Sequence, residues 1–209
     1  MSKVPRTAYI TAPITGIGDR KWIPFPREST AANSQEFTKP DLTVLDVGLT
    51  GVLYTVALAV QHFRRQTRTD DRLLGRLGLV ASVCGLYCVP SLPIYTTAKH
   101  ALVGLTRSYG KLLVDERITV NAVAPNVVQT SISSPVIYDK LAKDNLLTPM
   151  DGLMDAFDTM LGSSCSGEVF ECGPAGGWTQ RAATEYLNKG SAEICSLLNV
   201  RARGLHYLA

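Results

Sequence analysis

Three residues in this sequence are placed to move a proton on the oxygen of a small molecule. Tyr95 and Lys99 stand at i and i+4, so on a helix their side chains share one face and can interact. A lysine ammonium favours the phenolate and lowers the pKa of a tyrosine from about 10, which makes the phenol a general acid/base. Ser82 precedes the pair and supplies a hydroxyl that can hold a carbonyl or alcohol oxygen.

These residues need a strand and a helix to position them. Residues 78–82 (GLVAS) predict a short apolar strand that ends in the serine, and the turn-rich residues 89–93 follow. The helix that carries Tyr95 and Lys99 comes next. Residues 118–125 (ITVNAVAP) then predict a second buried strand.

The stretch from Leu42 to Thr130, together with residues 166–172 (SGEVFEC), resembles the short-chain dehydrogenase/reductase family. The family's strand ending in serine, its YxxxK helix and its NxxxPGxVxT strand and loop occur here in order, the last as residues 121–130 (NAVAPNVVQT). The resemblance implies a Rossmann-like α/β fold with a doubly wound parallel sheet. It implies one domain over residues 1–209, with a shortened, irregular cofactor-binding start (1–41) and a catalytic and carboxyl-terminal part (42–209).

The resemblance also implies a function. The expected protein is an NAD(P)-dependent oxidoreductase that interconverts a carbonyl and a secondary alcohol, with NADP or NAD as cofactor and no metal. Tyr95 would exchange the proton, Lys99 would lower its pKa and bind the nicotinamide ribose, and Ser82 would hydrogen-bond the substrate. The other residues implied for cofactor binding are Pro125, Val128 and Thr130 at the nicotinamide, and Thr11, Gly16, Ile17 and Gly18 at the adenosine side and phosphates.

The substrate is expected to be an apolar small molecule. This expectation rests on the apolar residues around the presumed pocket, which are Leu86, Tyr87, Val89, Pro90 and Val136.

The beginning of the chain departs from the family pattern. Residues 8–18 (AYITAPITGIG) resemble the first strand and its TGxxxGxG loop, but Ala12 replaces the first glycine. Residues 19–27 contain prolines and no helical period, so no helix follows for a phosphate. The interval up to Leu42 is also shorter than the roughly 30 residues of one βαβ unit. Strands 2–4 of the family are therefore expected to be missing.

Two interpretations of this start remain open. Residues 1–18 are either a true first strand joined to the region after the fourth, which we favour, or residues 10–18 are a degraded fourth strand and its turn. In addition, Gly48 stands where the family usually has an asparagine that positions a proton-relaying water. These departures support an alternative: a degenerate family member that no longer binds dinucleotide and acts as a non-redox enzyme or a dimerisation partner.

Composition limits the remaining possibilities. The chain has 209 residues, 45% of them hydrophobic and 19% charged, which is typical of a globular protein. A net charge of +3 is too small and dispersed to indicate a nucleic-acid partner. Five cysteines without paired CxxC spacing predict free thiols in a reducing compartment, and the first residues lack a signal-peptide pattern, so we expect a cytoplasmic protein.

Residues 47–60 are an uncharged apolar run, shorter than the ~20 residues of a membrane span. We therefore expect a buried helix and no membrane contact. In the family this helix and the YxxxK helix pack against a partner subunit, which implies a homo-oligomer through residues 42–65 and 95–114.

The rest of the sequence predicts three more elements: a helix from Pro149 to about residue 161, a final strand over 167–172 and a polar helix over about 184–198. Trp178 and Tyr186 are expected to be packing residues.

Overall fold

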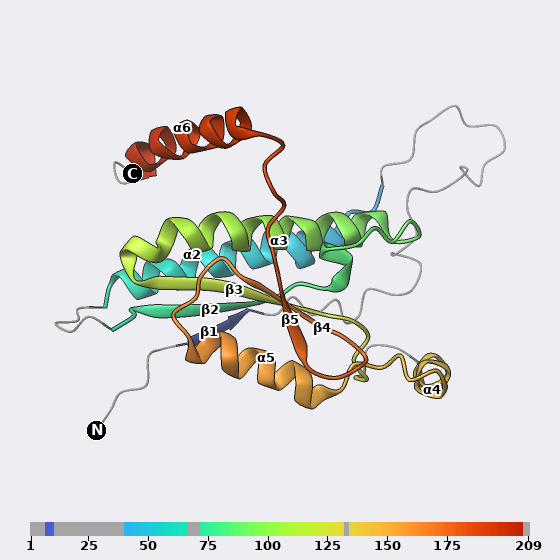
Figure 1. The fold of residues 1–209 in the computed structure, drawn as a ribbon. Helices are drawn as coiled ribbons and strands as arrows, with labels where there is room; N and C mark the ends of the chain where they lie inside the picture. The colour runs from blue at the N-terminus through green and yellow to red at the C-terminus, as the bar shows by residue number, and fades with distance from the viewer. Residues whose placement is uncertain (1–6, 11–39, 67–71, 132–133, 207–209) are drawn as a thin grey trace, which may run out of the picture.

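The computed structural model describes residues 7–10, 40–66, 72–131 and 134–206. In this part of the chain five strands form one sheet in the order β1-β2-β3-β4-β5 (Figure 1). Strands β1 to β4 run parallel, and β5 runs antiparallel to β4. The strands are β1 (Thr7–Ile10), β2 (Gly75–Val80), β3 (Ile118–Pro125), β4 (Val169–Cys172) and β5 (Trp178–Arg181).

Helices cover both faces of the sheet. α2 (Gly51–Arg64) and α3 (Pro93–Leu112) lie on one face and α5 (Met150–Gly162) on the other (Figure 1). This arrangement confirms the predicted Rossmann-like α/β fold with a parallel sheet. The other helical segments are α1 (Thr43–Leu45) and η2 (Asp46–Thr50), which lead directly into α2, then η3 (Val83–Gly85), η4 (Leu113–Glu116), α4 (Pro135–Lys143) and α6 (Lys189–His206).

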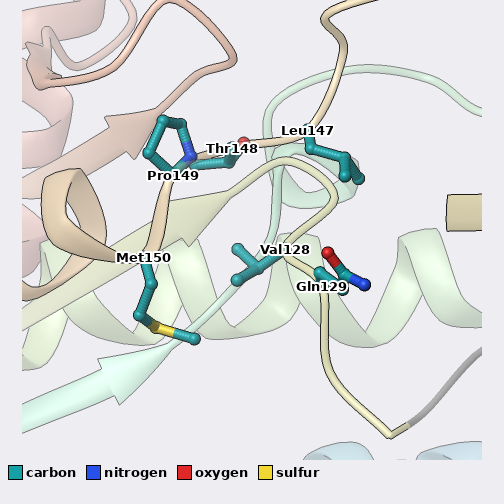
Figure 2. Close-up of a pocket in the computed structure, with 6 residues that line it drawn as sticks. All are labelled: Val128, Gln129, Leu147, Thr148, Pro149 and Met150. Carbon is teal, nitrogen blue, oxygen red and sulfur yellow. The ribbon is translucent and has the colours of Figure 1, made fainter. Parts of the chain in front are cut away.

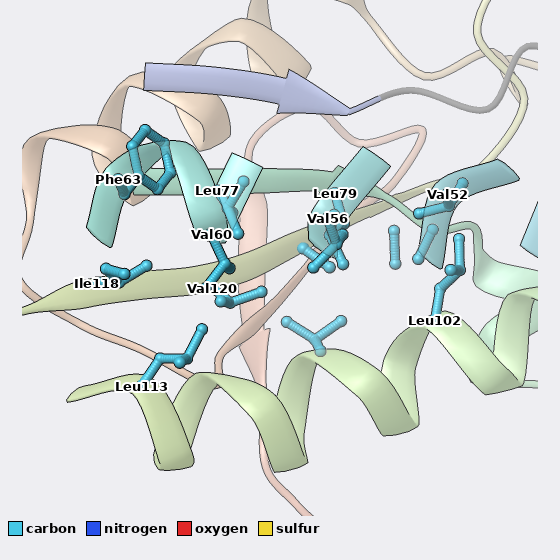
Figure 3. Close-up of a cluster of buried hydrophobic side chains, with 14 residues drawn as sticks. Val52, Val56, Val60, Phe63, Leu77, Leu79, Leu102, Leu113, Ile118 and Val120 are labelled. Atoms are coloured by element: carbon cyan, nitrogen blue, oxygen red, sulfur yellow. The ribbon is translucent and has the colours of Figure 1, made fainter. Parts of the chain in front are cut away.

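Side chains that alternate along β2 build the two layers of the core. Leu77 and Leu79 are fully buried on the α2–α3 face, where they pack with Val56 (Figure 3). Gly78 lies between them on the opposite face, where a Cβ would stand 2.7 Å from Cε of Met160 in α5. Both faces of β2, the strand that leads to Ser82, are therefore closely packed against helices.

The apolar helix expected to be buried is buried on one face only. Val52, Val56 and Val60 pack in the core, whereas Tyr54 and Leu58 are 69% and 65% exposed. By length and composition residues 43–64 would suffice to cross a membrane, a test that core helices of soluble proteins also pass. Its valine face packs against β2, which is the arrangement of a core helix with one apolar face left uncovered.

The strand over 169–172 is not the last one, contrary to expectation. The segment after it reverses at Gly176 and Gly177, whose φ angles of +78° and +71° suit glycine, and returns as β5. Trp178 on β5 packs edge-on against Phe170 at 5.0 Å between ring centroids, and its Nε1 donates to Asp155 Oδ2 at 2.8 Å. This packing of Trp178 agrees with its predicted role.

The last helix also differs from its prediction. α6 begins after Asn188, whose Oδ1 accepts the backbone N–H of Ser191 at 2.9 Å, and it extends to His206. The predicted start near residue 184 is wrong, because residues 182–188 are not helical and Asn188, not Thr184, caps the helix. Tyr186, expected to pack, is 61% exposed.

The position of β1 bears on the two interpretations of the beginning of the chain. β1 pairs directly with β2, the strand that leads to Ser82. In both interpretations β2 stands in the place of the family's fifth strand, because it is the strand that leads to Ser82. In the classic order 3-2-1-4-5-6 the fifth strand lies beside the fourth, so the position of β1 favours the second interpretation, a degraded fourth strand, over the first. The described residues between β1 and β2, 40–66 and 72–74, contain helix and loop only. The loop expected to hold the dinucleotide phosphates, residues 11–18, lies outside the described part.

Candidate active site

Ser82 stands just beyond the carboxyl end of β2. Its backbone is extended, its Oγ accepts the N–H of Cys84 at 3.2 Å, and it is 8% exposed. Gly85 then allows a close approach to α3, because a Cβ there would lie 2.6 Å from the carbonyl oxygen of Lys99. This approach holds Ser82 against the helix face that carries the other two predicted residues.

Tyr95 and Lys99 lie one turn apart on α3, as predicted from their spacing. The Nζ of Lys99 is 5.6 Å from the centre of the Tyr95 ring, and the Ser82 hydroxyl is hydrogen-bonded to the Tyr95 side chain. Lys99 is only 2% exposed, and its ammonium donates to the carbonyl oxygen of Val80 at 2.9 Å. The structure therefore brings the three residues together at the end of β2.

Burial dominates the protonation of this cluster. It raises the pKa of Tyr95 above the ordinary value of 10.0, while the bond to Ser82 lowers it by less. Burial also lowers the pKa of Lys99 to about 8. The expected lowering of the Tyr95 pKa by Lys99 is thus wrong in this arrangement, because desolvation is the larger effect and the ammonium is directed at Val80. At neutral pH Tyr95 is a protonated phenol.

Cys84 is a neighbour that the sequence analysis treated only as a free thiol. It is buried, and its negative charge, when present, raises the pKa of both Tyr95 and Lys99. No sequence pattern pointed to it, because its position depends on how η3 folds against α3. All five cysteines are free in the structure, as predicted.

The loop after β3 carries the residues expected at the nicotinamide. β2 and β3 end at the same edge of the sheet, since Val80 is in register with Val123, and Pro125 ends β3. Val128 lines a cavity of about 430 Å³ (Figure 2). Thr130 lies beyond it, with its Oγ1 3.3 Å from the Tyr138 hydroxyl of α4. The residues that line the cavity are Val128, Gln129, Leu147, Thr148, Pro149 and Met150.

Thr148 also lines this cavity, and the sequence analysis did not single it out. Its backbone N–H donates to the carbonyl of Val127 at 2.8 Å, which joins the two loops that form the cavity. Its Oγ1 is buried and has no hydrogen-bond partner in the described part of the chain. A buried hydroxyl without a partner costs free energy, so a polar ligand group beside it would be stabilised. The Thr-Pro pair had predicted only a helix start, and α5 does begin there, with Pro149 at the N-cap.

The five apolar residues expected to surround the substrate are not among those that line the cavity beside Val128 and Thr148. Leu86 packs partly against the core. The hydroxyl of Tyr87 donates to Glu171 at 2.9 Å, and Arg181 stands 5.8 Å from its ring. Val136 is 76% exposed on α4. Leu86 and Tyr87 are thus engaged by the core and by residues of β4 and β5, and the apolar character of the substrate stays a prediction.

Of the two departures from the family pattern, the structure describes Gly48 but not the loop near the beginning of the chain. Gly48 is buried within η2, a π-helical turn, and such turns are frequent at functional sites. η2 packs against α3, the helix that carries Lys99. Thr11, Gly16, Ile17 and Gly18, expected at the adenosine and phosphates, lie outside the described residues.

Comparison with known proteins gives a consistent result. The profile of the short chain dehydrogenase family matches residues 28–140, more than half of the chain. The short-chain dehydrogenase/reductase ATR7 of Stachybotrys chlorohalonatus is 38% identical over 95 residues, which cover 46% of this chain and 28% of the relative. Prx6 of Penicillium rubens, also a short-chain dehydrogenase/reductase, is 30% identical over 136 residues, 64% of this chain and 44% of the relative.

Among solved structures, the 3-hydroxyacyl-CoA dehydrogenase type-2 of Mycobacterium avium is similar in fold. It has a TM-score of 0.59 and 25% identity, over 71% of this chain and 62% of that one. The chain spans less than half the length of the two curated relatives.

Proposed function

Because this chain belongs to the short-chain dehydrogenase/reductase family, we propose that it is an NAD(P)-dependent oxidoreductase that interconverts a carbonyl and a secondary alcohol on an apolar small molecule. The observation that carries the proposal is the hydrogen bond between Ser82 and Tyr95 beside the buried Lys99. A phenol, a hydroxyl and an ammonium are the groups that stabilise charge and move a proton at a carbonyl oxygen.

Each of the three residues has a separate task in this reaction. In carbonyl reduction Tyr95 donates its proton to the substrate oxygen, which its raised pKa favours at neutral pH. Ser82 donates a hydrogen bond to the same oxygen as negative charge develops there. Lys99, with a pKa of about 8, keeps a positive charge near the phenolate that remains. A bound dinucleotide supplies or accepts the hydride at the carbonyl carbon.

The residues at the edge of the sheet fit a nicotinamide. Val128 lines the cavity of about 430 Å³, and the unpartnered hydroxyl of Thr148 in its wall suits a polar amide group. Lys99, Pro125 and Thr130 complete the set that we propose for the nicotinamide and its ribose.

The second candidate function is a degenerate family member that no longer binds dinucleotide. Two observations favour it: Gly48 offers no side chain to the proton relay, and the position of β1 is that of a fourth strand. In that case Tyr95 would serve a non-redox acid/base reaction, or the chain would act as a dimerisation partner.

Titration with NADH and NADPH separates the two candidates. Nicotinamide fluorescence and melting temperature are followed for the wild type, for Lys99→Met and for the exposed control Lys143→Met on α4. Saturable binding that raises the melting temperature and is weakened only by Lys99→Met supports the oxidoreductase. A folded protein that binds neither nucleotide overturns it and leaves the second candidate.

We also propose that a second copy of the chain covers the exposed face of α2. Tyr54 and Leu58 present an apolar surface there. It lies within residues 42–65, one of the two segments that the family resemblance implies for the contact. In the other segment, 95–114, the side of α3 that carries Ser108 and Lys111 faces α6 instead.

The change Leu58→Glu should convert a dimer to a monomer by light scattering after size exclusion. The matched change Val136→Glu, at an exposed position on α4 outside the proposed contact, should not. A monomeric wild type would contradict this assembly.

A further inference from the structure

α6 turns its polar side toward the domain. Leu197 and Leu205 are 71% and 66% exposed, whereas Ser196, Asn199 and Arg203 line a cavity between α6 and α3. Figure 1 shows α6 beside α3, on the outer side of the helix layer. A helix that packs on a domain core normally buries its apolar side. The contact between α6 and α3 is therefore built as a polar cavity and not as an extension of the core.

This cavity has the size of a small-molecule site. Its volume is about 530 Å³, within the range of known ligand pockets. α3 contributes Arg107, Ser108 and Lys111 to its wall, opposite the polar residues of α6. None of the residues that line it is acidic, and three of them are cationic.

The positive charge of the cavity is only partly neutralised. Arg107 donates through Nη2 to the carbonyl oxygens of Arg181 and Ala182, at 2.9 Å each, and these carbonyls carry no net charge. The exposed ammonium of Lys111 has no ion-pair partner among the described residues.

Arg203 is the third cation, and its donors are incompletely used. Its Nη1 pairs with Asp115 at 2.7 Å, while its Nε is buried and has no partner in the described structure. A buried N–H of a guanidinium without an acceptor is costly. An acceptor bound in the cavity would remove this cost.

We propose that the cavity between α3 and α6 binds a small anion with at least two negative charges, a polycarboxylate or a phosphate compound. Lys111 and Arg203 make charge-assisted hydrogen bonds to it, and Ser108 and Asn199 donate neutral ones. Lys111 lies sixteen residues beyond Tyr95 on α3, which is roughly 24 Å along the helix, so this site is separate from the catalytic cluster. The anion holds α6 against the domain.

Protection of a thiol provides a test that reports on this location. Cys195 lines the cavity and is exposed, and Cys88 is an exposed thiol in the segment before α3. Both are alkylated with iodoacetamide in the presence of increasing pyrophosphate or citrate, with sodium chloride adjusted to constant ionic strength, and each site is followed by peptide mass spectrometry. We expect at least one anion to slow alkylation of Cys195 about fivefold or more in a saturable manner, with Cys88 unchanged. The more effective anion identifies the class.

A matched pair of variants tests the contacts. Lys111→Gln should raise the half-protecting concentration about tenfold, because one charge-assisted contact is lost, whereas Lys143→Gln on α4 should leave it unchanged. The proposal is overturned if neither anion protects Cys195, if Cys88 is slowed equally, or if the two variants behave alike.

Discussion

The ammonium of Lys99 donates a 2.9 Å hydrogen bond to the carbonyl oxygen of Val80, the last residue of β2. This bond ties α3 to the strand that leads into Ser82, and it places a cation in a site that is almost closed to water. Desolvation of the charge is the cause of the lowered pKa of Lys99, about 8. The cluster of Ser82, Tyr95 and Lys99 therefore contains a group whose protonation changes just above neutral pH.

Replacing this lysine should change how stability depends on pH. The pKa of Lys99 is about 8 in the folded state against 10.5 for an ordinary lysine, so the folded protein releases this proton first. Stability therefore rises with pH in this window, and the free energy of unfolding should increase by about 2 kcal/mol between pH 8 and pH 10. Lys99→Met should lack this increase in urea unfolding at pH 8, 9 and 10. Identical pH profiles of the two proteins would refute the assignment.

Removal of the phenol should abolish most of the proposed activity. Tyr95→Phe keeps the ring and loses the proton, so reduction of a small ketone should slow by about 10²–10⁴-fold, with nucleotide binding retained. Ser82→Ala should slow it by about 10²-fold, since one hydrogen bond to the developing charge is lost. Cys88→Ser, an exposed change, serves as the control. Steady-state kinetics with a panel of ketones measures all three, and a Tyr95→Phe protein as fast as wild type would exclude Tyr95 as the acid.

The two directions of the reaction should respond differently to pH. Burial raises the pKa of Tyr95 above 10.0, so the phenol is protonated up to that pH. Alcohol oxidation needs the phenolate and should accelerate about tenfold per pH unit between pH 7 and 9, because the phenolate fraction rises in that proportion. Carbonyl reduction needs the protonated phenol, so its rate should not increase between pH 7 and 9. Rates measured in both directions over this pH range show whether each rises or falls with pH. An oxidation rate that does not change above pH 7 would contradict a raised pKa of Tyr95.

Two glycines on α3 should respond in opposite ways to alanine. A Cβ at Gly110 would lie 2.4 Å from the backbone nitrogen of Gly167 and 2.7 Å from the carbonyl of Val120, so Gly110→Ala should cost about 1–3 kcal/mol. A Cβ at the exposed Gly104 meets no atom within 4 Å, so Gly104→Ala should stabilise by about 0.5–1 kcal/mol through helix propensity. Chemical denaturation distinguishes them, and equal effects would show that α3 does not pack as described.

Glu116 should anchor the end of α6. It accepts hydrogen bonds from Arg64 and lies 3.0 Å from Nε2 of His206, and the bond from Arg64 holds the pKa of its carboxyl below the usual 4.5. Its stabilisation is present above about pH 4.5 and is lost as the pH falls below it. Glu116→Gln should lose about 1–2 kcal/mol at pH 7.

Stability measurements at acidic pH provide a control for this prediction. The difference between wild type and Glu116→Gln should shrink toward pH 4, when the carboxyl takes up its proton. The exposed Glu193, 3.9 Å from Lys189, should matter by less than about 0.5 kcal/mol when changed to Gln. The backbone amides of α6 should exchange faster in Glu116→Gln than in the control Glu193→Gln. Equal exchange rates in these two variants would argue against the anchoring role of Glu116.

Local patterns in the sequence were sufficient for the parts of this protein that depend on neighbouring residues. The i, i+4 spacing places Tyr95 and Lys99 on one face because any α-helix does so. The mainly apolar sequence of β3 (ITVNAVAP) predicts a buried strand, and the structure buries it on both faces, including Thr119 and Asn121. Contacts between distant segments were beyond such patterns. The pairing of β1 with β2 and the docking of α6 are examples.

The sequence by itself determined which residues can do chemistry and the family to which they belong, because residue type and helical or strand period are encoded within a few positions. Only the tertiary structure decided their chemical state. The direction of the Tyr95 and Lys99 pKa values follows from burial and from the Val80 carbonyl, and the position of β1 beside β2 follows from pairing across a long stretch of chain. Burial and long-range pairing depend on the packing of the whole domain.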